Sequence, residues 1–207
     1  MMATTHALAG VVLAVLVGLL FPEGVAGTSV IPVAAAALGG LFPDFDLYAG
    51  HRRTLHFPVY FSVAAVVAAL VAVASPTVVT VAVALFLAAA ALHSAMDALG
   101  GGLELKPWLG TSDRAVYSHY HGRWIPPRRW VRYDGAPEDL VVAIAFAAPA
   151  VYVLDGFAET GVLVAVAVSM LYVLVRKPMV IVTQKVVDAL PRGLVDRLPA
   201  RFVEDFQ

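Results

Sequence analysis

Residues 77–99 read TVVTVAVALFLAAAALHSAMDAL, an apolar run whose only two ionisable side chains, His93 and Asp97, lie near its end. Its length and composition predict a helix that crosses a membrane, because a span needs about 20 apolar residues. Four residues separate His93 from Asp97, so both side chains project from one helical face and can grip one ion together. Ionisable groups are costly near lipid and are usually retained there for function.

The rest of the chain has a similar composition. Hydrophobic residues make up 60% of the 207 residues and charged residues 14%, with a mean hydropathy of +0.83, whereas soluble domains contain about 25% charged residues. The sequence therefore predicts an integral membrane protein with one domain, residues 1–207. The chain has no cysteine, which excludes disulfides and thiolate metal ligands. The net charge of −1 gives no reason to expect nucleic-acid binding.

Six apolar segments predict an all-α fold, a bundle of about six transmembrane helices with interfacial segments. Their lengths favour helix over strand within a membrane. A cleaved signal peptide is the competing interpretation of the first segment, since residues 25–27 are small, but residues 1–6 lack the Lys or Arg that such signals carry. The six segments are residues 5–21, 25–42, 57–74, 77–99, 140–154 and 157–175.

Basic residues predict the orientation of this bundle. All fourteen Lys and Arg residues follow the second, fourth or sixth segment, and the other three links contain none. Under the positive-inside rule, the chain is a multi-pass cell-membrane protein with both termini in the cytoplasm. Residues 100–139, which hold all three Trp residues, and the tail 179–207 are expected to rest on the membrane surface.

The predicted topology brings seven His and Asp side chains to the cytoplasmic edge. Histidine and carboxylate are ligands of catalytic zinc, manganese and iron. Simpler interpretations exist for the parts: residues 44–46 could form a turn that caps a helix, the pair in the fourth segment could satisfy itself within the bundle, and His119 and His121 could be surface residues. The seven are His6, Asp44, Asp46, His51, His56, His93 and Asp97.

Four ordered segments carry a family resemblance: Thr5-His6, LFPDFD at 41–46, HRRTLH at 51–56 and HSAMD at 93–97. Over residues 1–110 the chain resembles the YdjM-like family of LexA-regulated, inner-membrane-associated, metal-dependent hydrolases. In that family the third segment is usually His-Arg-Gly-X-Thr-His. This chain departs from the pattern with Arg53 in place of Gly and Leu55 in place of Thr.

The His-X-X-X-Asp element is also similar to the core of zinc-dependent phospholipase C and of single-strand-specific zinc nucleases. The resemblance implies one or two divalent ions, zinc first with manganese or iron as alternatives, and a bridging carboxylate at Asp97. The second His-X-X-X-Glu/Asp element of those enzymes is missing, so a three-metal site is not expected. The implied ligands are His6, Asp44 or Asp46, His56, His93 and Asp97.

The expected function is hydrolysis of a phosphoester, phospholipid-like or lipid-linked, by metal-activated water at the cytoplasmic membrane face. Asp46 and His51 are the candidate catalytic residues, and Arg52 and Arg53 are candidates for binding an anionic headgroup. The expected partners are membrane lipid and a lipid-like phosphoester substrate. A metal or ion transporter is an alternative. It is disfavoured because transport sites lie near the bilayer midplane, whereas these His and Asp side chains are expected at one edge of the membrane. A non-catalytic scaffold with a structural metal is another.

Overall fold

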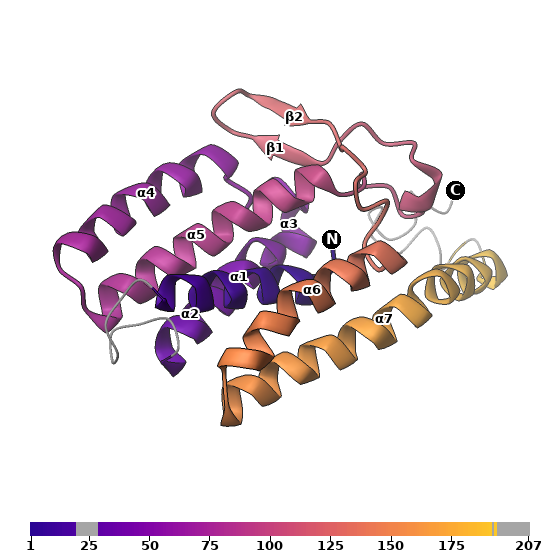
Figure 1. The fold of residues 1–207 in the computed structure, drawn as a ribbon. Coiled ribbons are helices and arrows are strands. Elements are labelled where there is room, and N and C mark those ends of the chain that lie inside the picture. The colour runs from indigo at the N-terminus through magenta and orange to yellow at the C-terminus, as the bar shows by residue number, and fades with distance from the viewer. Residues whose placement is uncertain (20–28, 192, 194–207) are drawn as a thin grey trace.

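The computed structural model describes residues 1–19, 29–191 and 193, so the small residues 25–27 of the alternative cleavage site lie outside the described residues. Helices form most of this part of the chain, and the segment between α5 and α6 holds a short β-hairpin among loops and turns (Figure 1). The elements are α1 (Ala3–Gly18), α2 (Val30–Leu41), the 3-10 helix η1 (Phe42–Asp46), α3 (Leu47–Gly50), α4 (Pro58–Ala74), α5 (Val78–Leu99), the 3-10 helix η2 (Pro107–Leu109), β1 (Val116–Ser118), β2 (Arg123–Ile125), α6 (Pro137–Val153) and α7 (Gly156–Ala189).

The helical class predicted from the sequence is confirmed, and each of the six apolar segments corresponds to a helix: α1, α2, α4, α5, α6 and α7. Three stretches are long and apolar enough to cross a membrane: Val30–Gly50, Val78–Leu99 and Gly156–Ala189. The first of these joins α2, η1 and α3. Helices α1 and α4 are apolar but shorter, with 16 and 17 residues. Six spans therefore stay a prediction.

Glycines let the central helices approach closely. Helix α2 packs on α1 and α5, α5 also packs on α4, and α6 packs on α1 and α7. A Cβ atom added at Gly39 of α2 would lie 2.1 Å from the backbone oxygen of Phe86 in α5, and one added at Gly40 would lie 2.3 Å from that of His6 in α1. Only glycine permits these backbone contacts, which is a common device where membrane helices cross.

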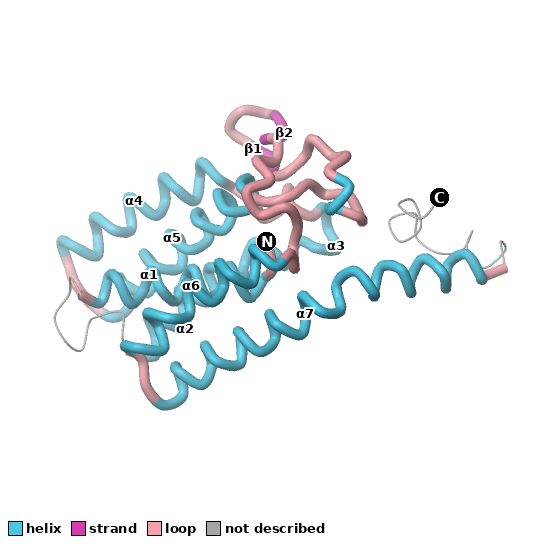
Figure 2. Tube along the Cα trace, turned by 45° about the vertical axis from the view of Figure 1, so that its right-hand side comes forward, coloured by secondary structure: helices cyan, strands magenta, loops and turns pink. Residues whose placement is uncertain are grey.

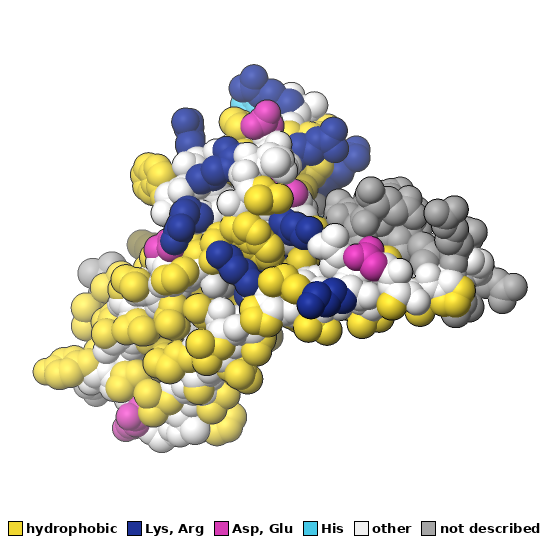
Figure 3. Space-filling view, turned by 90° about the vertical axis from the view of Figure 1, so that its right-hand side faces the viewer, with side chains coloured by type: hydrophobic (Ala, Val, Ile, Leu, Met, Phe, Trp, Pro, Cys, Tyr) yellow, Lys and Arg dark blue, Asp and Glu magenta, His cyan; other side chains and the backbone are white. Residues whose placement is uncertain are grey.

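The outer surface of the bundle is largely apolar. Large hydrophobic side chains are exposed along α4 and α7, including Val66 and Leu70 on α4 and Leu171 and Leu174 on α7. Figure 3 shows Lys and Arg side chains gathered toward one end of the molecule, whereas hydrophobic side chains cover most of the other end. An exposed apolar surface of this extent suits contact with lipid.

The segment after α5 folds over the end of the bundle. The backbone N–H groups of Arg128, Arg129 and Trp130 donate to the carbonyls of Ala98, Gly100 and Leu99 at 2.9, 3.0 and 2.9 Å. Carbonyls at the end of a helix have no partner within the helix, so residues 128–130, called the strap below, cap α5. The antiparallel hairpin of β1 and β2, which the sequence analysis did not predict, lies at this same end (Figure 1).

Helix α7 extends further than the sequence suggested. It continues through Pro178 to Ala189, so the first part of the predicted surface tail, residues 179–189, belongs to α7. Figure 2 shows α7 reaching past the end of the other helices. Two contacts tie it to the segment after α5: Arg176 Nε donates to Asp134 Oδ2 at 2.8 Å, and Lys106 Nζ donates to Gln184 Oε1 at 2.6 Å. The tail at 194–207 lies outside the described residues.

Candidate metal centre

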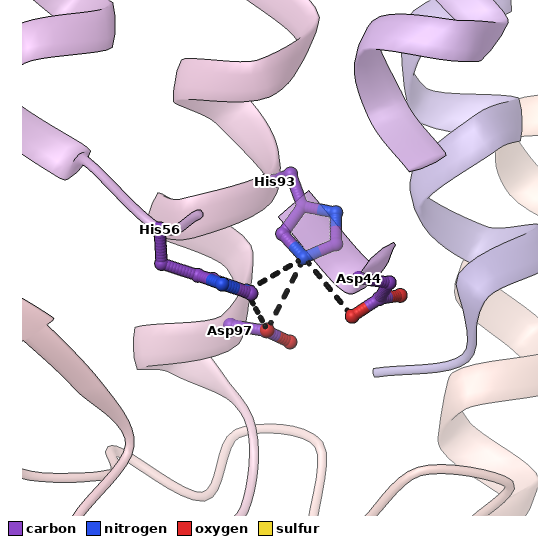
Figure 4. Close-up of side chains that lie close together, drawn as sticks. All are labelled: Asp44, His56, His93 and Asp97. Carbon is purple, nitrogen blue, oxygen red and sulfur yellow. Dashed lines mark hydrogen bonds and ion pairs between the residues drawn. The ribbon is translucent and has the colours of Figure 1, made fainter. Parts of the chain in front are cut away.

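Four side chains from three places in the chain meet near the end of α5 (Figure 4). Asp44 comes from η1, His56 from the segment just before α4, and His93 and Asp97 from the last turns of α5. Each offers one ligand atom, and these four atoms lie within 4.8 Å of one another. The convergence predicted from the sequence is confirmed for these four residues, and the cluster could hold a metal ion.

The individual distances fit one ion. His56 Nε2 lies 3.1 Å from His93 Nε2 and 3.3 Å from Asp97 Oδ2. His93 Nε2 lies 3.4 Å from Asp97 Oδ2 and 3.5 Å from Asp44 Oδ1. Four tetrahedral ligands, each about 2.0–2.1 Å from a zinc ion, would be roughly 3.3 Å apart. The spacing therefore agrees with a shared cation.

The hydrogen bonds of the two histidines also call for a cation. His93 Nδ1 lies 2.6 Å from the carbonyl oxygen of Gly40, and His56 Nδ1 lies 3.0 Å from Asp46 Oδ2. Both partners can only accept, so each Nδ1 carries the hydrogen and each neutral ring presents its Nε2 lone pair. Two lone pairs then face each other across 3.1 Å. Either a proton on one of the rings or a metal ion bound by both would remove this repulsion, and the carboxylates of Asp44 and Asp97 would stabilise positive charge at this position.

Three of the four residues in the cluster are buried, and the fourth lines a cavity. His56, His93 and Asp97 are at most 1% exposed. The side chain of Asp44 is 24% exposed and lines a cavity of about 710 Å³. A ligand-sized space therefore adjoins the possible metal position at Asp44.

Asp46 lies behind His56, outside the group of four. Its Oδ2 accepts from His56 Nδ1 and from the backbone N–H of Leu55, both at 3.0 Å. Its Oδ1 accepts from His51 Nδ1 at 3.1 Å and from the backbone N–H of Arg52 at 3.3 Å. A carboxylate that holds the far nitrogen of a metal-binding histidine fixes the ring and its tautomer.

His6 adjoins the cluster through Asp97. Its Nε2 lies 3.0 Å from Asp97 Oδ1, and its ring stacks on that of His93 with 3.7 Å between centroids. The amino group of Met1 is 2.8 Å from the same oxygen. The two oxygens of Asp97 thus face different neighbours, His6 on one side and the two histidines of the cluster on the other. His6 Nδ1 is buried without a hydrogen-bond partner in the described part of the chain.

His51 and Arg52 connect the cluster with the cavity, which both side chains line. Arg52 is 6% exposed, its Nη1 donates to the carbonyl of Gly101 at 2.8 Å, and its Nε lies 3.2 Å from Asp97 Oδ2. Its φ of 59° is in the left-handed region, which a residue with a Cβ rarely adopts. The bond from its own N–H to Asp46 and the bond from Tyr117 N–H to its carbonyl, at 2.9 Å, hold that conformation.

Arg53, unlike Arg52, does not line the cavity. The guanidinium of Arg53 lies over the ring of Tyr117, 4.8 Å from the centroid, and its side chain is exposed. Its carbonyl accepts from His119 Nε2 at 2.6 Å, so His119 supports the backbone of this turn from outside the cluster. His121 is exposed as well, and its Nδ1 lies 2.8 Å from Ser118 Oγ within the hairpin.

The part of the cavity lining that comes from α7 was not predicted from the sequence. Helix α7 supplies Val168, Tyr172, Arg176 and Val180 to it. These residues recur every fourth position, the spacing of one helical face, and that spacing was the available signal. The chain matches no family model, no curated protein and no solved structure.

Proposed function

We propose that the protein is a metal-dependent hydrolase that cleaves phosphoesters at the cytoplasmic face of a membrane. One observation carries the proposal: two imidazole Nε2 atoms face each other at 3.1 Å beside two carboxylates, with both Nδ1 atoms already bound to acceptors. Asp44, His56, His93 and Asp97 would hold the ion. Imidazole and carboxylate ligands suit zinc, with manganese and iron as alternatives.

A divalent ion in such a site supplies positive charge that polarises a phosphoryl oxygen and lowers the pKa of water. The protein's own residues would do the rest of the work. Arg52 lies between Asp97 and the cavity, and its guanidinium suits the oxygens of a phosphate. Its proximity to the cluster would place a bound phosphoester beside the ion.

His51 is the candidate for proton transfer. Asp46 accepts from its Nδ1, which fixes the ring and leaves Nε2 as the nitrogen that exchanges a proton. The side chain of His51 is 28% exposed and lines the cavity. A purely structural metal needs neither a neighbouring cavity nor polar groups along its wall, so the position of His51 and Arg52 favours catalysis.

The test compares the parent protein with Asp97→Asn and His119→Ala in detergent. Bound zinc, manganese and iron are measured after loading, and turnover is measured with bis(p-nitrophenyl) phosphate. Asp97→Asn removes the charge that faces His6, His56 and Arg52, so metal content and turnover should both fall more than about 100-fold, beyond the effect of losing an outer-shell partner. His119→Ala should stay within about threefold of the parent, because its ring lies outside the cluster.

Two results would contradict this proposal. A parent protein that binds none of these metals under any loading condition removes its basis. An Asp97→Asn variant that keeps full metal and full turnover would show that the cluster is assigned to the wrong role.

A further inference from the structure

The cavity beside the cluster has two chemically different ends. Asp44, His51 and Arg52 line it next to the possible metal position. Helix α7 supplies much of the rest of the lining. The volume of about 710 Å³ is far larger than a phosphoryl group requires and falls in the range of sites that enclose whole organic ligands.

One face of α7 lines the cavity over several turns. Its lining residues are Val168, Tyr172, Arg176, Met179, Val180 and Thr183. Between the first and the last of these the helix rises by about 22 Å. The wall thus extends well away from the cluster, along a helix that is itself long and apolar enough to cross a membrane.

The charges along this wall are already paired. Arg176 Nε donates to Asp134 Oδ2 at 2.8 Å, and Tyr172 Oη donates to the same oxygen at 2.6 Å. Most of the remaining lining is apolar, including Val168 and Met179 on α7 and Leu105 after α5. Its other polar residues are Thr4, Thr183 and Glu104, whose Oε1 accepts from the backbone N–H of Ser112 at 3.2 Å. A ligand that reaches this wall therefore meets mainly hydrocarbon.

We infer that the cavity binds a lipid phosphoester, with its phosphoryl group at His51 and Arg52 and a hydrocarbon chain along the Val168 to Thr183 face of α7. This inference rests on the proposed function and names its substrate class. A small hydrophilic phosphoester would use only one end of the cavity. A hydrocarbon chain laid along α7 would contact the apolar side chains of the cavity, and each methylene of the ligand that is removed from water strengthens binding.

Val168 is the residue that tests the apolar wall. Its side chain is 49% exposed and lines the cavity, so a larger side chain can project into the cavity without disturbing the core. Val175 is a matched control, since it is the same residue type on the same helix, is 40% exposed, and is not part of the cavity lining. The two variants are Val168→Trp and Val175→Trp.

The experiment measures binding of butyl, octyl and dodecyl phosphonate to the metal-loaded full chain in detergent. These probes are not phosphoesters and cannot be hydrolysed. In the parent and in Val175→Trp, Kd should fall with each added methylene by up to about fourfold, the value expected for complete burial. In Val168→Trp the dependence on chain length should flatten, while butyl phosphonate binds as in the parent. The longer probes partition more strongly into micelles, so each Kd is calculated from the measured free concentration of the probe.

The outcomes separate this inference from the proposed function. Binding of all three phosphonates with equal Kd by the parent overturns the inference, as does a Val168→Trp variant that keeps the parent's dependence on chain length. In either case, turnover of bis(p-nitrophenyl) phosphate by the parent would leave the proposed hydrolysis standing. A protein that binds the phosphonates in order of chain length but hydrolyses neither that diester nor a long-chain phospholipid would overturn the proposed function alone.

Discussion

Asp46 binds two histidines with different neighbours. One oxygen accepts from His56, whose other nitrogen points into the cluster, and the other accepts from His51, which lines the cavity. Two backbone N–H groups, those of Arg52 and Leu55, complete its four bonds. A single carboxylate thus fixes the turn between η1 and α4, and the side chains of this turn reach both the cluster and the cavity.

Replacing Asp46 with Asn tests this positioning role. The amide keeps the size of the side chain but directs a donor at groups that themselves donate, so His56 should lose its preferred tautomer. Metal affinity should fall by about 10-fold to 100-fold, the range seen when an outer-shell partner of a ligand is removed. The measurement is competition against a chelator of known affinity, with the exposed Asp113→Asn as control. Equal affinity in parent and Asp46→Asn would mean that the carboxylate does not orient a ligand.

Some of the site could be predicted from single residues. The spacing of His93 and Asp97 places them on one helical face in any helix, so their proximity follows from local geometry. The different positions of Asp44 and Asp46 could not be predicted, because they depend on how the 3-10 helix η1 turns each carboxylate. The separation of Arg52 from Arg53 likewise depends on the left-handed φ of Arg52 and on contact with Tyr117.

At the level of elements, the position of the cluster depends on how closely α1, α2 and α5 pack. The carbonyl of Gly40 accepts from His93. Because Gly40 has no side chain, the backbone of His6 can approach it closely. Gly10 of α1 approaches Ala36 of α2 in the same way, where an added Cβ would lie 2.1 Å from the backbone oxygen. Helix packing and metal geometry are therefore coupled at α2.

Gly40→Ala tests this coupling. The added methyl would lie 2.3 Å from the backbone oxygen of His6, so α1 must shift, which should cost about 1–3 kcal/mol of stability and weaken metal binding. Gly161→Ala on α7 is the control, since an added Cβ there meets nothing within 4 Å, and this change should be neutral or stabilising by up to about 1 kcal/mol. Thermal unfolding in detergent, followed by circular dichroism, measures both. Equal melting temperatures for the two variants would argue against tight packing at Gly40.

The helices were predictable and the segments that cover the site were not. Long apolar runs bounded by Pro, Gly or charged residues predict helices from composition alone. The strap at residues 128–130 caps α5 with backbone N–H groups, which any residue type could supply. The continuation of α7 through Arg176, Lys177 and Pro178 is stabilised by contacts with Asp134 and Trp108, residues distant in sequence. Tertiary contacts of this kind leave no local pattern.

The ion pair between Arg176 of α7 and Asp134, which lies between α5 and α6, should depend on pH. Burial raises the pKa of the Asp134 carboxyl, but the hydrogen bonds and charge of Arg176, together with the hydrogen bond from Tyr172, outweigh burial and hold that pKa below its ordinary value. A depressed pKa in the folded state gives stability that is present above the unfolded pKa of about 3.9 and is lost as the pH falls through the lower folded value.

Asp134→Asn should therefore lower stability at pH 7 by about 2 kcal/mol, the scale of a hydrogen bond to a charged group. The difference from the parent should shrink as the pH falls below about 4, because the parent then loses the same interaction. Melting temperatures between pH 7 and pH 3 measure this, with Asp113→Asn as the exposed control. Parallel curves for parent and Asp134→Asn would contradict the assigned contribution of this carboxylate.

At the scale of the whole molecule, the distribution of Lys and Arg predicts which side of the membrane the cluster faces. The cluster lies by the last turns of α5, where Arg52, Arg128 and Arg129 are also found. Figure 3 shows Lys and Arg side chains gathered toward one end of the molecule. Asp155 and Glu159 lie around the link between α6 and α7, a link without basic residues. The positive-inside rule predicts that the basic end faces the cytoplasm, and with that orientation the proposed substrate would be taken from the inner leaflet.

Single cysteines test this orientation, and the absence of cysteine from the chain makes each introduced thiol unique. Ser75→Cys lies between α4 and α5, Asp155→Cys between α6 and α7, and Asp113→Cys in the segment that covers the site, and all three positions are exposed. With six spans, an impermeant thiol reagent added to intact cells should label the first two, while Asp113→Cys should react only after the membrane is opened. Labelling of Ser75→Cys and Asp155→Cys from different sides would exclude a six-span bundle, because both links follow an odd-numbered span and must then emerge on one side. The reverse pattern, with Asp113→Cys alone accessible, would keep the bundle but turn the cluster outward, and the substrate would then have to come from the outer leaflet.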